Sequence, residues 1–306
     1  MQKRSNRSTS QRSEPSRGGN SRKPSRPANG RNSQRGPSME VRGPKSSGSF
    51  TPDQKKNSDV KEIQKRFPRL VAGHHAVVEA IKKVSSGDAV LWLSRTWESS
   101  KDLRELEKEA NSKKIQIEIK PDEALKAAYP GNQGACLFVK TGPKWELSNV
   151  GDEKYQTLLI LDGVEDPHNL GAILRTSWLL GVSAVVIPQD RAVGLTPTVH
   201  KVACGGAEYV PVVTVPNLAQ FNEEAKKIGF WVFGLSHKAE KEIHQVKFPE
   251  RMIWVLGAED SGMRVTTERV CDELVKLPQL EKSASFNVSN AAAMALFETA
   301  RQKSSS

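Results

Sequence analysis

The feature that most constrains the fold is a series of short, continuously apolar segments that begins at residue 157. The first of them, TLLIL (Thr157–Leu161), lacks the polar alternation of a half-exposed strand and is typical of a parallel strand buried on both faces. Similar strands are predicted at Ala184–Pro188, Tyr209–Val213, Trp231–Leu235, Ile253–Gly257 and Glu273–Pro278, with a closing helix near Asn287–Lys303. Helical patterns separate several of these strands, so the order of elements predicts a parallel α/β sheet.

A smaller α/β unit is predicted before this region. Its expected elements are a helix at Val71–Val84, a strand at Asp88–Ser94, an amphipathic helix at Ser100–Lys114, a strand at Ile115–Lys120, a short helix and a strand at Gly134–Lys140. We therefore expect a small domain over 67–141, a polar linker over 142–156 and a larger domain over 157–304.

Residues 1–66 are predicted to form a disordered basic tail. The first 60 residues hold 14 Lys+Arg and 4 Asp+Glu with only six apolar side chains, whereas the following 246 residues hold 32 against 31. Such a segment buries too little surface to offset the entropy of ordering it. Two interpretations are open: a solubilising extension, or an arm that binds nucleic-acid phosphates without sequence preference.

Several classes of protein are disfavoured. The longest apolar run, near Trp178–Ile187, is too short to span a bilayer, and the N-terminus lacks the apolar core of a secretory signal. Three separated cysteines, Cys136, Cys204 and Cys271, form no CxxC pair, which favours reduced thiols and no metal site. A cytoplasmic protein is expected.

Ligands of parallel α/β sheets bind at the carboxyl ends of the strands, so the loops after Leu161, Gly257 and Leu277 are the candidate site. The chain has no GxGxxG, HExxH or GxSxG motif. The segment Gly257–Arg264 (GAEDSGMR) has the glycine spacing of a phosphate loop but lacks its lysine, which disfavours a nucleoside-triphosphate site.

The first loop, Asp162–Arg175 (DGVEDPHNLGAILR), contains Asn169 and Arg175. Asn169 stands where a helix cap is wanted, and that role alone would explain it. Arg175 lies in an otherwise apolar helix, where it either extends to solvent along the surface or directs its charge into a cleft.

The other two loops also have alternative interpretations. In the second, Gly257 and Gly262 allow close approach of the backbone to a ligand, and Glu259 is either an ordinary loop acid or the partner of a cation. In the third, Asn287 precedes a helix, either as its cap or as part of a site for an anion or RNA backbone at the helix N-terminus.

Together the three loops resemble the three motifs of the SpoU family of RNA 2′-O-ribose methyltransferases, over about Leu158–Lys303. The segments Lys201–Val212, Ala72–Lys83 and Asn132–Leu137 extend the similarity to two-domain bacterial members that methylate a guanosine ribose in large-subunit ribosomal RNA. The resemblance implies a C-terminal α/β domain with a trefoil knot, a ribosomal-protein-like RNA-binding domain before it, S-adenosyl-L-methionine as cofactor and a homodimer without metal.

The resemblance also implies roles for nine residues. The reaction-side residues would be Asn169, Arg175, Glu259 and Asn287, and the cofactor would be held around Gly257, Leu277, Pro278, Ser285 and Phe286. Two positions depart from the usual pattern of the family, since Asp260 replaces a glycine and Phe286 replaces a leucine.

The reaction implied is attack of a ribose 2′-hydroxyl on a sulfonium methyl, in which the protein aligns the atoms and manages one proton. Arg175 would act either as proton acceptor or, since a guanidinium stays protonated at neutral pH, by stabilising the forming alkoxide. The alternatives are a transfer-RNA methyltransferase and a non-catalytic RNA-binding or ribosome-assembly protein, although retention of all four reaction-side residues favours an enzyme.

Overall fold

The computed structural model describes residues 52–151, 156–281 and 284–304. Most of the predicted basic tail, residues 1–51, lies outside the described residues. The end of that tail was placed wrongly, because Pro52–Arg66 forms helix α1. Val60 and Ile63 of this helix are buried beside Phe67, so apolar residues near the end of the segment give it a packing partner that its composition does not suggest.

The first sheet has the strand order β1-β4-β2-β3. Strand β4 is antiparallel to both β1 and β2, and β2 is parallel to β3. The elements of this part are β1 (Arg69–Ala72), α2 (His74–Lys83), β2 (Ala89–Ser94), η1 (Trp97–Ser99), α3 (Lys101–Ser112), β3 (Gln116–Lys120), α4 (Asp122–Ala128) and β4 (Ala135–Val139).

Strand β1 is a difference from the sequence prediction, which started a helix at Val71. Gly73 separates strand from helix with a φ of 93°, a conformation that glycine adopts without steric cost. Alternate residues of the strands then face two layers: Leu91 and Leu137 pack with α2 and α3, while Trp92 and Phe138 pack with α1 and α4.

The second sheet is entirely parallel, with the order β10-β8-β9-β5-β6-β7, as the continuous apolar strands predict. Its elements are β5 (Gln156–Asp162), α5 (Pro167–Leu179), β6 (Ala184–Pro188), α6 (Pro197–Ala203), η3 (Gly206–Glu208), β7 (Val212–Val215), α7 (Leu218–Lys227), β8 (Trp231–Leu235), η4 (Ile243–Gln245), β9 (Arg251–Gly257), α8 (Val265–Glu268), β10 (Glu273–Val275) and α9 (Val288–Ser304). The short helix η2 (Leu147–Asn149) lies between the two sheets in sequence.

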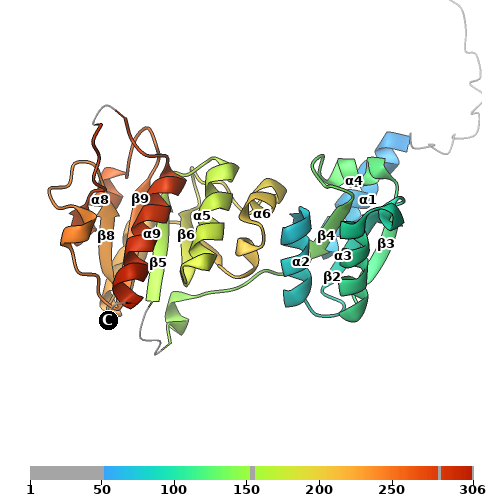
Figure 1. The fold of residues 1–306 in the computed structure, drawn as a ribbon, viewed down its shortest axis with the longest axis horizontal. Helices are drawn as coiled ribbons and strands as arrows, with labels where there is room; N and C mark the ends of the chain where they lie inside the picture. The colour runs from blue at the N-terminus through green and yellow to red at the C-terminus, as the bar shows by residue number, and fades with distance from the viewer. Residues whose placement is uncertain (1–51, 152–155, 282–283, 305–306) are drawn as a thin grey trace, which may run out of the picture. The chain divides into compact units, whose positions relative to one another are not determined.

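Helices cover both faces of this sheet. Helices α5, α6 and α9 bury one set of alternate strand residues, such as Leu159 and Trp254, whereas α7 buries the other set, such as Leu158 and Ile253. Figure 1 shows α5 and α9 beside the central strands β5 and β9. The second sheet and its helices therefore form a three-layer α/β arrangement, and the central strands of the sheet are buried.

Small residues bring the helices close to each other and to the sheet. A Cβ added to Gly171 of α5 would lie 2.6 Å from a side-chain atom of Val202, so α5 and α6 approach closely there. On α9, Thr299 accepts a 2.9 Å hydrogen bond from the indole of the fully buried Trp254. These contacts hold α5 against α6 and α9 against the sheet.

Hydrogen bonds connect the first sheet and its helices with the segment around α6 and η3. Glu208, which is buried, forms an ion pair with Arg69 and lies 3.3 Å from Nδ1 of the fully buried His200. Glu79 accepts a 2.6 Å hydrogen bond from the hydroxyl of Tyr209. None of the helices in the described ranges is both long and apolar enough to cross a membrane.

Candidate active site

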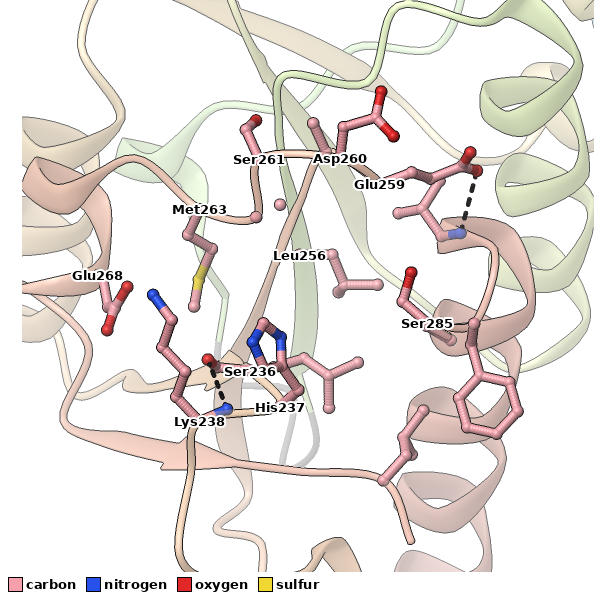
Figure 2. Close-up of a pocket in the computed structure, with 18 of the residues that line it drawn as sticks. Ser236, His237, Lys238, Leu256, Glu259, Asp260, Ser261, Met263, Glu268 and Ser285 are labelled. Carbon is pink, nitrogen blue, oxygen red and sulfur yellow. Dashed lines mark hydrogen bonds between the residues drawn. The ribbon is translucent and has the colours of Figure 1, made fainter. Parts of the chain in front are cut away.

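The carboxyl ends of neighbouring parallel strands form one edge of the second sheet. Asp162 at the end of β5 is the ladder partner of Gly257 at the end of β9, and β8 lies on the other side of β9. A cavity of about 530 Å³ opens at this edge. Its walls come from the loop after β8, the loop after β9 and the segment that precedes α9 (Figure 2). This volume lies within the usual range for a small-molecule site.

Three of the predicted reaction-side residues meet at one end of this cavity. Glu259 Oε1 accepts hydrogen bonds from Asn169 Nδ2 at 2.9 Å and from Asn287 Nδ2 at 2.6 Å. Asn287 Nδ2 also lies 3.0 Å from Asn169 Oδ1, and the backbone N–H of Val288 points to Glu259 at 3.3 Å. The carboxylate therefore lies at the N-terminus of α9, where the helix dipole favours negative charge. We refer to Asn169, Glu259 and Asn287 as the Asn–Glu–Asn cluster.

Asn169 does not cap its helix. Helix α5 begins at Pro167, and its cap is Asp166, whose side chain accepts the backbone N–H of His168 at 2.9 Å. Proline is common at the first position of a helix, so Pro167 in the sequence could have indicated that the helix begins before Asn169. The side chain of Asn169 is consequently available to the cluster.

Arg175 lies apart from the Asn–Glu–Asn cluster. It is exposed on α5, and within the described residues its guanidinium contacts Cys204 Sγ at 3.6 Å rather than any member of the cluster. Six residues of helix turn the side-chain direction by about 240°, so Asn169 and Arg175 leave α5 on different sides. The backbone at Gly206 packs closely against that of α5, because a Cβ on Gly206 would lie only 2.6 Å from the carbonyl oxygen of Leu174.

Four of the five predicted cofactor-binding residues line the cavity, namely Gly257, Leu277, Ser285 and Phe286, whereas Pro278 is not among its lining residues. Phe286, at 38% exposure, presents an apolar wall to the opening. At Gly257 an added Cβ would lie 2.0 Å from the backbone of Gly262, so only glycine fits this strand end. The loop after Gly257 therefore folds tightly back on itself.

Sequence reasoning missed two features of the site. His237 and Lys238, in the loop after β8, also line the cavity (Figure 2). The rule that ligands bind at carboxyl ends of strands could have indicated this loop, because β8 is a neighbour of β9. The second feature, an ion pair between Asp162 and Arg264, joins residues 102 positions apart and had no local signal.

The described residues contain no group of three or more His, Cys, Asp or Glu side chains arranged to hold a metal ion. The expectation of a metal-free site stays a prediction.

A parallel α/β domain with a cavity at the carboxyl ends of its strands is the architecture of a methyltransferase of the SpoU class. Residues 156–297 match the SpoU rRNA Methylase family. The chain is also 38% identical over 242 residues to the 23S rRNA (guanosine-2'-O-)-methyltransferase RlmB of Neisseria meningitidis serogroup B, which covers 77% of this chain and 96% of that protein. The chain belongs to the SpoU rRNA methylase family.

Other relatives match over shorter stretches. The 23S rRNA (guanosine-2'-O-)-methyltransferase RlmB of Bordetella pertussis is 52% identical over 146 residues, which is 48% of this chain and 60% of that protein. The chain thus spans about three fifths of that relative's length in the alignment.

Solved structures share the fold. The SpoU methyltransferase AviRb from Streptomyces viridochromogenes, in complex with the cofactor AdoMet, superimposes with a TM-score of 0.70 at 20% identity, covering 84% of this chain and 99% of that one. A putative RNA methyltransferase of the TrmH family from Porphyromonas gingivalis gives a TM-score of 0.64 at 20% identity, covering 83% and 100%. The SpoU methyltransferase fold is thereby confirmed.

Proposed function

We propose that the protein transfers a methyl group from S-adenosyl-L-methionine to a ribose 2′-hydroxyl of RNA, on a guanosine of large-subunit ribosomal RNA. The observation that carries the proposal is the Asn–Glu–Asn cluster at the mouth of the cavity, with hydrogen bonds of 2.6–3.0 Å among its three side chains. Relatives of the chain are named as 23S rRNA (guanosine-2'-O-)-methyltransferases, which supports ribosomal RNA rather than transfer RNA as the substrate.

The residues present fit the proposed cofactor. The cavity is large enough for a nucleoside with an amino-acid side arm. Because the backbone of Gly262 lies so close to Gly257, this part of the wall offers backbone groups rather than side chains to a bound cofactor. Leu277 and Phe286 offer apolar contacts for a base, while Ser285 offers a hydroxyl. When bound, the cofactor supplies an activated methyl group, so the protein needs no strong electrophilic group of its own.

The protein's own residues would position the ribose and manage its proton. With Glu259 held by two amides and one backbone N–H, the cluster presents fixed polar groups next to the cavity. Arg175 would enter from a different side of α5, as proton acceptor or as a cation that stabilises the forming alkoxide. The second role needs no deprotonation of the guanidinium, which stays charged at neutral pH.

Three further features of the family belong to this proposal: a trefoil knot in the second domain, assembly as a homodimer, and RNA binding by the small unit over 67–141. A ribosomal RNA substrate fits a protein of the cytoplasm. The basic segment 1–51, with 12 Lys+Arg against 2 Asp+Glu, would add salt-sensitive attraction to phosphates.

The experiment is transfer of labelled methyl from S-adenosyl-L-methionine to large-subunit ribosomal RNA and, in parallel, to transfer RNA. We expect incorporation into ribosomal RNA only, with the label mapped to a guanosine 2′-oxygen. Incorporation into transfer RNA alone would transfer the assignment to that substrate. Cofactor binding without incorporation into either RNA would favour the non-catalytic RNA-binding or assembly protein.

A further inference from the structure

The carboxylate of Asp162, at the end of β5, is completely buried. Both of its oxygens are occupied by one residue: Oδ2 accepts the backbone N–H of Arg264 at 2.9 Å, and Oδ1 accepts its Nε–H at 2.5 Å. Arg264 itself stays 41% exposed. The two residues are far apart in sequence, so this contact joins the end of β5 to the chain that leaves the loop after β9.

A buried carboxylate is costly unless a cation and hydrogen-bond donors compensate for the lost water. Here a single arginine supplies the charge and both donors. Removing the guanidinium would leave one oxygen of a buried charge without its partner, and the chain would have to move to let water reach it. The position of residue 264 is therefore strongly coupled to Asp162.

The loop between β9 and Arg264 is a closed turn. Gly262 N donates to Ala258 O at 2.9 Å, and the backbone of Gly262 and Met263 lies against Gly257. Gly257 is in turn the ladder partner of Asp162. Both ends of the turn are consequently held at the same residue, one by the sheet and the other by the ion pair.

This turn, residues 258–263, forms one wall of the cavity and carries Glu259 (Figure 2). Its polar side chains, Glu259, Asp260 and Ser261, are exposed, whereas Met263 at its end is buried in an apolar cluster of the sheet. Met263 and the adjacent ion pair of Arg264 therefore hold this end of the turn together. Glu259 is also held by the amides of Asn169 and Asn287 and by the backbone N–H of Val288. A shift of the turn by one ångström would lengthen several of these hydrogen bonds together.

We propose that Asp162 and Arg264 are positioning residues for methyl transfer. Their ion pair fixes the position of the turn at residues 258–263. This turn forms one wall of the cofactor cavity and holds Glu259 against Asn169 and Asn287. The inference rests on the proposed function, because the turn is taken as the cofactor wall. It also gives a role to the arginine that stands near the place where a phosphate loop would have its lysine.

The test compares Arg264→Ala and Arg264→Lys with the wild-type protein, and uses Arg301→Ala as a matched control because Arg301 pairs with Glu298 on the exposed side of α9. Binding of S-adenosyl-L-methionine is measured by calorimetry, methyl transfer by kcat and KM, and folding by urea unfolding. We expect Arg264→Ala to weaken cofactor binding and lower kcat by about 10-fold or more each, the scale of a lost charge-assisted hydrogen bond. RNA affinity should stay as in the wild type.

Arg264→Lys should recover part of the cofactor affinity, because it restores the charge without the planar Nε donor. A purely structural role would instead lower unfolding stability in both variants and leave the cofactor affinity of the folded protein unchanged. That result, or wild-type kcat and cofactor affinity in Arg264→Ala, would overturn the proposal.

Asp162→Asn supplies the second arm, since it keeps the shape and one acceptor but removes the charge. Combined with Arg264→Ala it should add little further loss, because the interaction is already broken. If Asp162→Asn fails to fold, the variants of Arg264, whose side chain is 41% exposed, still test the proposal. If the wild-type protein binds cofactor but methylates no RNA, the proposed function fails while the cofactor-binding arm of this test still applies.

Discussion

Asn287, the residue immediately before α9, donates its side-chain amide to Glu259 across 2.6 Å, and its Oδ1 accepts the backbone N–H of Ser289 at 2.9 Å. One side chain therefore caps the helix through its oxygen and joins the cluster through its nitrogen. The capping interpretation of Asn287 is confirmed, and its amide nitrogen serves Glu259 because the two ends of an amide differ in hydrogen-bonding character. The binding of an anion or RNA backbone at this helix terminus stays a prediction.

Asn287→Asp separates these two uses. It keeps a capping oxygen but replaces the donor with a carboxylate that faces Glu259, so we expect methyl transfer to fall by at least about 10-fold while helix stability is largely kept. Asn287→Ala removes the cap as well and should cost about 1 kcal/mol of unfolding free energy in addition. Activity assays and urea unfolding of both variants check this. Full activity in Asn287→Asp would remove the amide donor from the mechanism.

Arg175→Ala and Arg175→Lys should both strongly reduce methyl transfer while cofactor binding persists, since Arg175 does not line the cavity. Loss of one preorganised charge-stabilising group costs about 100-fold to 1,000-fold in rate. Single-turnover methylation and calorimetry give the two measurements. Cys204→Ala is the control for the 3.6 Å contact of the guanidinium, and it should retain activity. Retained turnover in Arg175→Ala would contradict the catalytic assignment.

Gly257→Ala should impair both folding and cofactor binding. Its Cβ would lie 2.0 Å from the backbone of Gly262, which cannot move without opening the closed turn, and overpacking of this kind costs about 1–3 kcal/mol. Gly194→Ala is the matched control, because a Cβ there meets nothing within 4 Å. Urea unfolding and cofactor titration of the two variants should differ clearly. Equal behaviour would show that the turn is more compliant than the geometry indicates.

Unfolding stability should fall as the pH is lowered below about 6.5. Burial lowers the pKa of His200 in spite of the opposing effect of Glu208, so the unfolded chain binds this proton first and acid favours unfolding. Burial alone would raise the pKa of Glu208, but the adjacent imidazole of His200 and the charge of Arg69 outweigh it, and the net pKa is lowered. Its contribution is therefore present above a pH of about 4.5 and is lost as the pH falls further.

Urea unfolding between pH 8 and pH 5 measures this dependence, with His200→Gln as the comparison. The variant should show a flatter profile between about pH 7 and pH 5.5, because it lacks the contribution of His200 to the slope. A wild-type stability that stays constant over this range would contradict the buried, neutral state of His200.

Removal of residues 1–51 should weaken RNA affinity mainly at low salt and leave cofactor binding intact. The segment carries a net charge of +10, and each phosphate contact it makes displaces condensed counterions. RNA titrations at several salt concentrations give the slope. An unchanged slope after the deletion would make the segment a solubilising extension.

The parallel sheet could be predicted from the sequence, because strands buried on both faces must be apolar throughout, as the segments TLLIL and IWVLG are. The sequence also placed Asn169, Glu259 and Asn287 in loops at one edge, since the carboxyl ends of parallel strands meet there. Some element boundaries were not predicted. The end of strand β1 overlaps a segment that was predicted as helix, and helix α1 lies at the end of the segment that was predicted as a basic tail.

The contacts between loop residues could not be predicted from the sequence, because they follow from the tertiary packing. The contact between Glu259 and Asn287, and the ion pair between Asp162 and Arg264, join segments 28 and 102 residues apart. Local propensity and periodicity report on neighbours within a few residues, whereas these contacts depend on how helices and strands pack across the whole sheet. The separation of Arg175 from the Asn–Glu–Asn cluster has the same origin, because the start of α5 at Pro167 and its packing against α6 fix where each side chain of that helix points.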